Sequence, residues 1–278
     1  MLTNHRLLID QDCPLCQFYS KTFVRLAWTD ADCAIPYQSE EAMQFKTINQ
    51  ERARNEIALL DLETGKTTYG VSSLIKILAH DKKWLQYLLH FPPVYFLLTI
   101  LYKFISYNRK VIAPYSCQTS SRSCNPDFNL SYRWAYIIFV ALATAIIVNN
   151  FTSFLFPHFG WPHNLTTEMI ICFGQVTWQS IAAYFITNRN KVTYLGNMST
   201  VSMLGALLLL PAILLMNVVD LSVYIKLVMF FSVIGFMFFE HIRRCHLLGI
   251  SSWMTVSWVA YRVTALSTLI YLIHNKII

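Results

Sequence analysis

Two cysteines near the start of the chain have the residue type and the spacing for redox chemistry. Cys13 and Cys16 are separated by two residues in the stretch Asp12-Cys13-Pro14-Leu15-Cys16. At a helix start, unpaired N–H groups and the positive end of the helix dipole stabilise a thiolate. On this reasoning Cys13 is the predicted nucleophile and Cys16 is the thiol that resolves the mixed disulfide. The same spacing also supplies half of a zinc site, so the pair alone leaves redox exchange and metal binding open.

The elements predicted around these cysteines place them at a corner between a strand and a helix. Residues 7–9 are a short apolar run, and the segment 14–28 has apolar residues at helical spacing. Pro14 falls in the first helical turn, where a missing N–H costs nothing and a fixed backbone angle suits the helix. A strand before the pair and a helix after it favour redox exchange over metal binding.

The remainder of the first 80 residues alternates strands and helices. The predicted elements are a strand at 33–37, a helical stretch at 39–55, a strand at 56–61, a turn at 63–65, a strand at 66–69 and a helix at 72–80. This order predicts an α/β domain of the thioredoxin or glutaredoxin class, with the cysteine corner after its first strand. That position again favours redox chemistry.

The stretch Asp10-Gln11-Asp12-Cys13-Pro14-Leu15-Cys16 resembles the signature of the DCC family of predicted thiol-disulfide oxidoreductases, which is named for its Asp, Cys and Cys. The resemblance extends over residues 5–115. Further matching positions are Leu60, Asp61, Gly65, Gly70, Tyr102, Asn108 and Arg109. The resemblance implies that Cys13 and Cys16 are the redox pair of a thioredoxin-like domain, with Asp10, Asp12 and Pro14 as neighbours in the active site.

Two features of the sequence set it apart from the usual thioredoxin pattern. No proline directly precedes the strand at 56–61, where that fold usually carries a cis-proline beside the active site. Asp10 and Asp12 bring negative charge to the cysteine corner, and nearby negative charge disfavours a thiolate. We therefore expect a more reducing pair than a strong oxidant would have.

Charge is unevenly distributed along the chain. Residues 1–132 hold 14 Lys and Arg and 12 Asp and Glu, whereas residues 133–278 hold 8 and 3 between long apolar runs. The first part is thus expected to be a soluble domain and the second a membrane domain. Most of the net charge of +7 lies in the second part, where basic residues set topology, so nucleic-acid binding loses its main support.

The residues before the cysteines indicate the cellular compartment of the first domain. No signal peptide precedes the cysteines, which predicts that the first domain stays in the cytoplasm. That compartment is reducing, so a catalytic or metal-binding pair is favoured there over a structural disulfide.

The stretch 84–107 is apolar enough for a membrane span, but His90 and the pair Pro92-Pro93 interrupt it. We expect two helices that complete the first domain. A location along the bilayer surface and a further span remain open as alternatives.

A linker with two further cysteines, Cys117 and Cys124, follows the first domain. Four alternatives are open for this possible second thiol pair. It forms a disulfide, exchanges with Cys13 and Cys16, completes a four-thiolate metal site with them, or consists of two unrelated thiols. The predicted division of the chain is a domain at 1–112, this linker at 113–132 and a membrane domain at 133–278.

The membrane domain is predicted as a bundle of about five helices. Its apolar stretches are 134–154, 169–187, 201–219, 224–239 and 253–273. Basic residues collect in alternate loops, near Arg133, near Arg189 and near Arg243, so these ends are predicted to face the cytoplasm and the C-terminus to lie outside. We expect a multi-pass protein of a bacterial inner membrane.

Polar residues inside these stretches are further site candidates, because each is costly in hydrocarbon. Arg262 is the sharpest case, and at about 1.5 Å per residue it lies at the depth of Gln175, with Glu168 above and Gln179 below. We expect a structural polar network in which Arg262 bonds to Gln175 or Glu168.

The sequence therefore predicts a membrane-anchored thiol-disulfide oxidoreductase with no cofactor and no metal. Its expected partner is a membrane or cytoplasmic protein that carries a disulfide. The membrane spans contain no pair of cysteines that would pass electrons across the bilayer, so they are expected to anchor the protein or to dock another membrane protein. The alternative is a non-enzymatic subunit of a membrane protein complex, whose cysteines are structural or bind metal.

Overall fold

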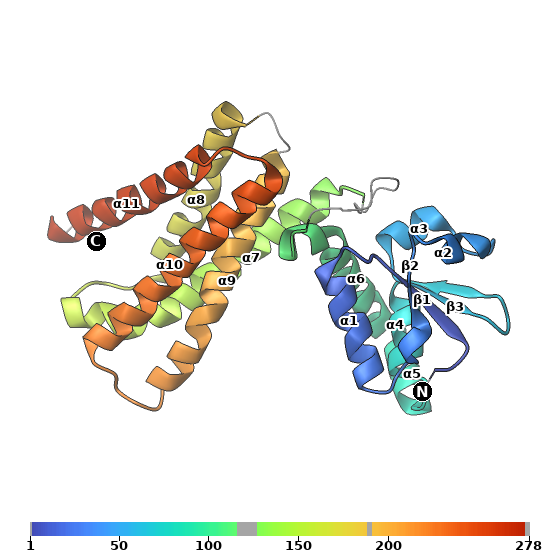
Figure 1. Ribbon diagram of the computed structural model, residues 1–278. Helices are drawn as coiled ribbons and strands as arrows, with labels where there is room; N and C mark the ends of the chain where they lie inside the picture. The colour runs from blue at the N-terminus through green and yellow to red at the C-terminus, as the bar shows by residue number, and fades with distance from the viewer. Residues whose placement is uncertain (1, 116–126, 188–190, 276–278) are drawn as a thin grey trace. The chain divides into compact units, whose positions relative to one another are not determined.

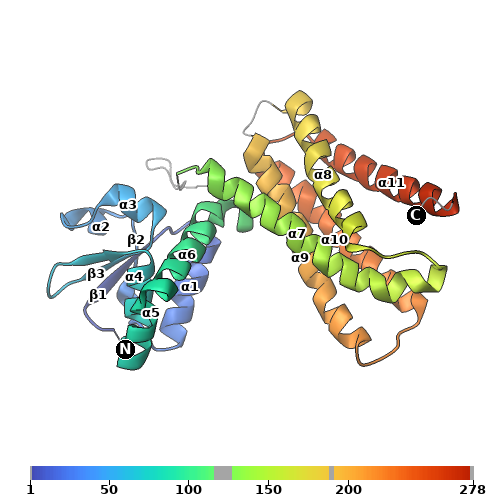
Figure 2. The same ribbon diagram turned by 180° about the vertical axis from the view of Figure 1, so that it is seen from behind.

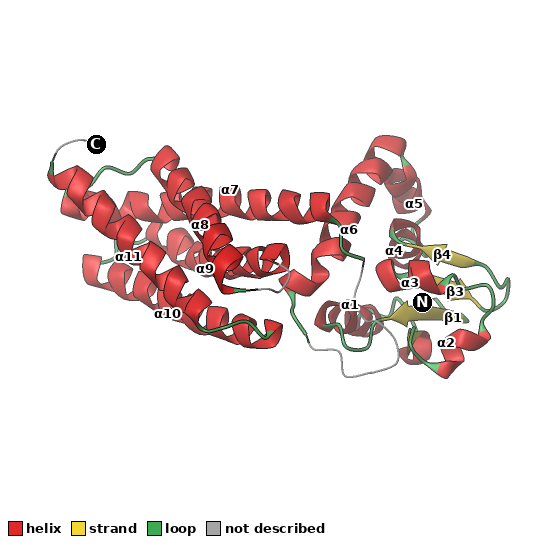
Figure 3. Cartoon of the chain, turned by 90° about the horizontal axis from the view of Figure 1, so that it is seen from above, coloured by secondary structure: helices red, strands yellow, loops and turns green. Residues whose placement is uncertain are grey.

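The chain divides into two units, Met1–Tyr132 and Arg133–Ile278. The computed structural model describes residues 2–115, 127–187 and 191–275 of them (Figure 1). The predicted second thiol pair, Cys117 and Cys124, lies outside these residues. Among the described residues, strands occur only in the first unit (Figure 3).

Four short strands form a mixed sheet in the first unit. They are β1 (His5–Ile9), β2 (Ala34–Pro36), β3 (Ala58–Asp61) and β4 (Thr67–Tyr69), in the spatial order β2-β1-β3-β4. β1 runs parallel to β2 and antiparallel to β3, and β3 runs antiparallel to β4. Parallel neighbours need a crossover, and the helix after the cysteines supplies it.

Helices cover both faces of this sheet, because its central strands are apolar on both sides. Leu7 and Leu59 pack with α1 (Pro14–Arg25) and α4 (Val71–Leu78) on one face. Leu8 and Leu60 pack on the other face with α2 (Glu40–Gln44) and α3 (Gln50–Asn55) (Figure 1). Adjacent residues of a strand point to opposite faces, so two cores form from one run. The predicted thioredoxin-like α/β fold is confirmed.

The polar helical stretch predicted at 39–55 is two short helices, α2 and α3. Ser39 caps the first, its side chain accepting a hydrogen bond from the Ala42 amide. Asn49 caps the second in the same way, through the Arg52 amide. A second capping residue inside a polar stretch starts a new helix, which is the physical reason for the break.

Two further helices, α5 (Lys83–His90) and α6 (Pro92–Ile112), belong to the first unit. They meet at an angle of 78° at the proline pair. The Tyr102 hydroxyl accepts a hydrogen bond from the Ile57 amide at 2.7 Å, and the Ser106 hydroxyl donates to the Asn55 carbonyl at 2.5 Å. These bonds fix α6 against the residues that lead into β3.

In its described residues the second unit holds five long helices, the first of which begins just before the boundary between the units, and one short 3-10 helix at Phe156–Phe159. The helices are α7 (Leu130–Leu155), α8 (Leu165–Ile186), α9 (Lys191–Met216), α10 (Val223–Leu248) and α11 (Trp253–His274). All five are long and apolar enough to cross a membrane. α9 packs along α10, and α8 packs along α11 (Figure 2). The chain thus carries the predicted multi-span helical bundle.

The helix α10 extends past its predicted end, so that Arg243 and Arg244 lie in its last turns instead of in a loop. Arg244 is buried, and its guanidinium donates hydrogen bonds to Glu240 at 2.7 Å and to Asn197 at 3.0 Å. Glu240 lies four residues before Arg244, so the two side chains share one face of α10 and the helix can continue through these charged residues.

Candidate active site

The cysteine pair lies at the corner between the end of β1 and the start of α1. Cys13 is the residue before the first helical turn, in an extended backbone conformation, and Pro14 occupies the first position of the helix. The Cys13 amide donates to the Asp10 carbonyl at 3.2 Å, and the Cys13 carbonyl accepts the first helical bond from Gln17 at 3.0 Å. The predicted strand-to-helix corner is therefore formed by bonds between neighbouring residues.

The two thiols are free, adjacent and buried. Cys13 is 0% exposed and Cys16 is 3% exposed. A hydrogen bond between the side chains lowers the pKa of Cys16 to about 6, and the Arg109 charge and the Tyr19 hydroxyl add to this effect. The same bond, with burial, raises the pKa of Cys13. The pair thus loses one proton readily and holds the other, as coupled sites do.

This distribution differs from the sequence prediction in one respect. Sequence reasoning assigned the thiolate to Cys13, from the helix dipole alone. In the structure the lower pKa falls on Cys16, one turn into the helix, because its sulfur accepts a hydrogen bond from the Cys13 side chain, and the Arg109 charge and the Tyr19 hydroxyl add to this effect. The Tyr19 pKa is raised well above its usual range by burial and by the neighbouring negative sulfur, so this hydroxyl stays a donor.

Arg109, in the last turn of α6, brings a positive charge to the thiols. It is 8% exposed, donates to the Arg54 carbonyl at 2.9 Å and lies 3.6 Å from the Asp10 carboxylate. Its charge acts on both cysteine sulfurs. A buried guanidinium that faces sulfur and carboxylate keeps its proton, and the Arg109 pKa is indeed raised by Cys16, Cys13 and Asp10 against the effect of burial.

Asp10 is buried at 3% exposure, and both oxygens of its carboxylate accept hydrogen bonds. One oxygen accepts hydrogen bonds from the Asp12 amide at 3.2 Å and from the Gln38 side chain at 3.1 Å. The other accepts the Tyr115 hydroxyl at 2.6 Å. Since Arg109 balances its charge, Asp10 opposes the thiolate less than its position in the sequence suggests.

Several of these residues were not assigned to the site from the sequence. Tyr19 follows Cys16 by three positions, a spacing that places two side chains on one helix face and could have indicated it. Arg109 was among the positions matching the family but received no role. Gln38 and Tyr115 carry no sequence signal of their own.

Metal binding has no further ligand set at this corner. Among the residues that the structure describes, no group of three or more His, Cys, Asp or Glu side chains is placed to hold a metal ion. The four-thiolate alternative falls outside the described residues, because it needs Cys117 and Cys124.

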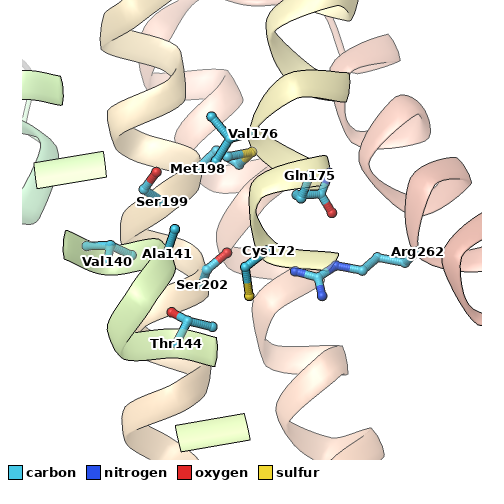
Figure 4. Close-up of a pocket in the computed structure, with 10 residues that line it drawn as sticks. All are labelled: Val140, Ala141, Thr144, Cys172, Gln175, Val176, Met198, Ser199, Ser202 and Arg262. Carbon is cyan, nitrogen blue, oxygen red and sulfur yellow. The ribbon is translucent and has the colours of Figure 1, made fainter. Parts of the chain in front are cut away.

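In the bundle, Arg262 and Gln175 line one cavity, together with Thr144 and Ser199 (Figure 4). Figure 4 shows Arg262 reaching from α11 toward Gln175 on α8. No hydrogen bond joins them: the Arg262 Nε atom and both polar atoms of Gln175 have no partner among the described residues. The Arg262 guanidinium lies 5.3 Å from the centre of the Trp258 ring instead.

The other two polar residues of the predicted network bond elsewhere. Gln179 accepts a hydrogen bond from the Tyr194 hydroxyl at 2.8 Å, and that hydroxyl also contacts His241 at 3.1 Å. Glu168 accepts from Thr152 at 3.4 Å. The structure therefore brings Arg262 and Gln175 together and places Gln179 and Glu168 in separate hydrogen-bonded groups.

Comparison with known proteins finds one family model that matches most of the first unit. Residues 7–113 match the sequence model of the family described as DCC1-like thiol-disulfide oxidoreductase. The match confirms the resemblance drawn from the cysteine motif, and it ends before α7, so it does not include the five apolar helices. No curated protein and no solved structure matches the chain.

Proposed function

We propose that this chain, a DCC1-like thiol-disulfide oxidoreductase domain joined to membrane-spanning helices, reduces disulfides with Cys13 and Cys16 at the cytoplasmic face of a bacterial inner membrane. One observation carries the redox role: two free thiols share a proton at a helix start, beside the buried Arg109 guanidinium. Positive charge and a shared proton keep one sulfur ionised at neutral pH.

The reaction balances two electrons and two protons. Cys13 is the sulfur assigned to attack, because Cys16 is held by the buried Tyr19 hydroxyl. Cys13 passes its proton to the Cys16 sulfur as it attacks, forms a mixed disulfide and releases one substrate sulfur as a thiolate, which takes up a proton from water. Cys16 then attacks Cys13, which releases the second substrate thiol and leaves a Cys13–Cys16 disulfide. A thiol reductant of the compartment must restore the dithiol.

The charges at the ends of the spans support a cytoplasmic location. Arg133 and Lys191 flank one side of the bundle, and Arg243 lies near the end of α10 on that same side. The loop at 157–167 between α7 and α8 has no Lys or Arg. Short loops rich in Lys and Arg stay in the cytoplasm. Helical spans, unlike closed barrels, fit an inner membrane.

The proposed substrate is a disulfide in a membrane or cytoplasmic protein partner. Both sulfurs are almost completely buried, so a partner must displace a neighbouring side chain to reach them. The same burial favours the second candidate function, a non-enzymatic subunit of a membrane protein complex in which the thiols only pack.

Disulfide reduction by the purified full chain separates these two functions. Wild type should reduce a model disulfide peptide, and Cys13→Ser should abolish this activity. Cys16→Ser should accumulate a mixed disulfide through Cys13, and Cys172→Ser, in the bundle, should leave the rate unchanged. Equal rates for Cys13→Ser and wild type, or stoichiometric zinc bound by the pair, would contradict the oxidoreductase function and favour the non-enzymatic subunit.

Topology is tested by single cysteines in a cysteine-free full chain produced in intact cells. Asp220→Cys, in the loop between α9 and α10, should react with a membrane-impermeant maleimide. Lys46→Cys, on the first unit, should react only after the cells are opened. The reverse pattern would place the thiols on the opposite face.

A further inference from the structure

The helices α5 and α6 cover the first unit with one face each and leave the other face uncovered. Leu85 of α5 and Tyr95, Leu98 and Tyr102 of α6 pack on α4. The opposite face of each helix carries large apolar side chains at helical spacing. These exposed side chains, here called the outer face, are Trp84, Tyr87, Leu88, Phe91, Phe96, Leu97, Ile100, Leu101 and Ile105.

The outer face is too large for the incidental apolar surface of a soluble domain. Tyr87 is 79% exposed and Phe96 is 67% exposed, and the other members are at least 41% exposed. At about 150 to 250 Å² for each aromatic side chain, the four aromatic members alone expose on the order of 500 Å², and the five Leu and Ile side chains add to this area. The largest apolar patch on a typical monomer is roughly 300 to 600 Å², so this face is built to be covered.

The charges around the outer face indicate what covers it. The segment from Lys82 to Ile112 contains no Asp or Glu, and Lys82, Lys83, Lys103 and Lys110 lie within it. Amphipathic helices with lysines and with Trp and Tyr on the apolar side lie in the headgroup region of anionic bilayers. A hydrophobic protein partner would not require this one-sided charge.

A bilayer is always within reach of these helices. The chain carries five helices that are apolar enough to cross a membrane, and 17 residues separate Ile112 from Leu130 at the start of α7. Even a fully extended linker of that length spans at most about 60 Å. The bilayer that α7 can cross therefore lies within that distance of the end of α6.

The α5–α6 pair does not cross the bilayer itself. Its two helices are bent by 78°, and the inner face of α6 is bonded to the first unit through Tyr102, Ser106 and Arg109. A span would have to carry those polar groups into hydrocarbon, where a polar group without a hydrogen-bond partner is strongly unfavourable.

We propose that the outer face of α5 and α6 inserts into the headgroup region of an anionic bilayer and holds the first unit on the membrane surface. This attachment does not depend on the thiols being active. It restricts the partners of the first unit to groups that lie close to the membrane.

The test uses the full chain in nanodiscs of phosphatidylcholine with phosphatidylglycerol. An environment-sensitive dye is attached to a single cysteine at Tyr87→Cys or Ile100→Cys in a cysteine-free background. Its emission should shift to shorter wavelength and be quenched by spin-labelled lipid. The same dye at Lys46→Cys, exposed near α2, should respond only to aqueous iodide. Retained helical circular dichroism confirms that each variant folds.

The charge dependence gives a second readout. Lys82→Glu with Lys83→Glu should raise the ratio of undocked to docked protein by about fivefold or more per lysine, and pure phosphatidylcholine should act in the same direction. Equal iodide quenching at positions 46, 87 and 100 would overturn the proposal. Protection from iodide without quenching by spin-labelled lipid would also overturn it, since protein would then cover the face.

Discussion

Arg109 in the first unit and Arg262 in the second differ in the polar partners that surround them. Arg109 donates a hydrogen bond to the Arg54 carbonyl and lies 3.6 Å from the Asp10 carboxylate. Arg262 lies in a membrane helix, and its Nε atom has no hydrogen-bond partner among the described residues. None of the ion pairs formed by those residues includes it.

The difference follows from what each environment supplies. In the first unit, helix ends and loops present backbone carbonyls and a carboxylate to Arg109. In the bundle, helices use their own backbone groups, so only side chains and water can meet a charge. The cavity beside Arg262 has about 10 Å³ for the centre of a water molecule, which is close to the space for one. The Arg109 charge is thus part of the hydrogen-bonded fold, whereas the Arg262 charge is expected to destabilise the bundle.

The largest expected effect is the loss of stability in Arg109→Met. This change leaves the Asp10 carboxylate buried beside an apolar side chain, at a cost of about 3 kcal/mol or more in the free energy of unfolding. Adding Asp10→Asn should recover most of that loss, because no buried charge remains. Urea unfolding of the full chain in detergent micelles, followed by fluorescence, measures both variants.

The matched control is Arg52→Met, which removes the exposed ion pair between Arg52 of α3 and Glu56, the residue after that helix. It should change stability by less than about 1 kcal/mol. An equal loss in both single variants, or no recovery in the double variant, would contradict the role assigned to Arg109.

The second effect has the opposite sign and lies in the bundle. Arg262→Leu should leave thermal stability unchanged or raise it, by up to about 3 kcal/mol, because it removes a charge that is costly in hydrocarbon. Arg244→Leu is the matched control, since Arg244 is bonded to Glu240 and Asn197 and its loss should destabilise the bundle. Thermal unfolding in micelles compares them. A marked loss in Arg262→Leu would mean that Arg262 has a structural partner after all.

The third effect is a pH dependence of the thiol pair. The pKa of Cys16 falls from an ordinary value of 9.0 to about 6 in the folded protein. The charged thiolate therefore stabilises the reduced fold fully above pH 9, and this contribution is lost as pH falls through about 6. The raised pKa of Cys13 removes stability only above its ordinary value of 9.0.

Alkylation by iodoacetamide, followed by mass spectrometry of the Cys16 peptide, measures the ionisation directly. The rate should reach half its maximum near pH 6 in wild type and at a clearly higher pH in Arg109→Met, which lacks the positive charge. A wild-type midpoint near pH 9 would show that the pair holds no stabilised thiolate.

The sequence predicts those parts of the first unit that depend on near neighbours. The spacing of Cys13 and Cys16, the proline after Cys13 and the alternation of strands and helices are local signals, and they led to the corner and to the fold. Arg109 reaches the same corner only because Tyr102 holds α6 against the start of β3. Packing between distant segments has no local signal, so its role could not be read from the chain.

In the bundle, too, the sequence predicts only part of how the polar residues meet. Counting the rise per residue places Arg262 level with Gln175, and both line one cavity. Depth in a membrane helix can be counted at about 1.5 Å per residue, but the rotation of each helix cannot. Rotation decides whether two side chains bond, which is why Gln179 pairs with Tyr194 instead.

The smallest effect concerns the hydroxyl of Tyr19, which acts on Cys16 alone. Tyr19→Phe removes one hydrogen bond to a charged sulfur, worth about 1.5 to 3 kcal/mol, and should raise the pKa of Cys16 by about one to two units. The control Tyr95→Phe removes a hydroxyl that bonds Ser72 away from the thiols, and it should leave the alkylation profile unchanged. An unchanged profile in Tyr19→Phe would mean that the hydrogen bond from Cys13 and the charge on Arg109 hold the Cys16 thiolate without the Tyr19 hydroxyl.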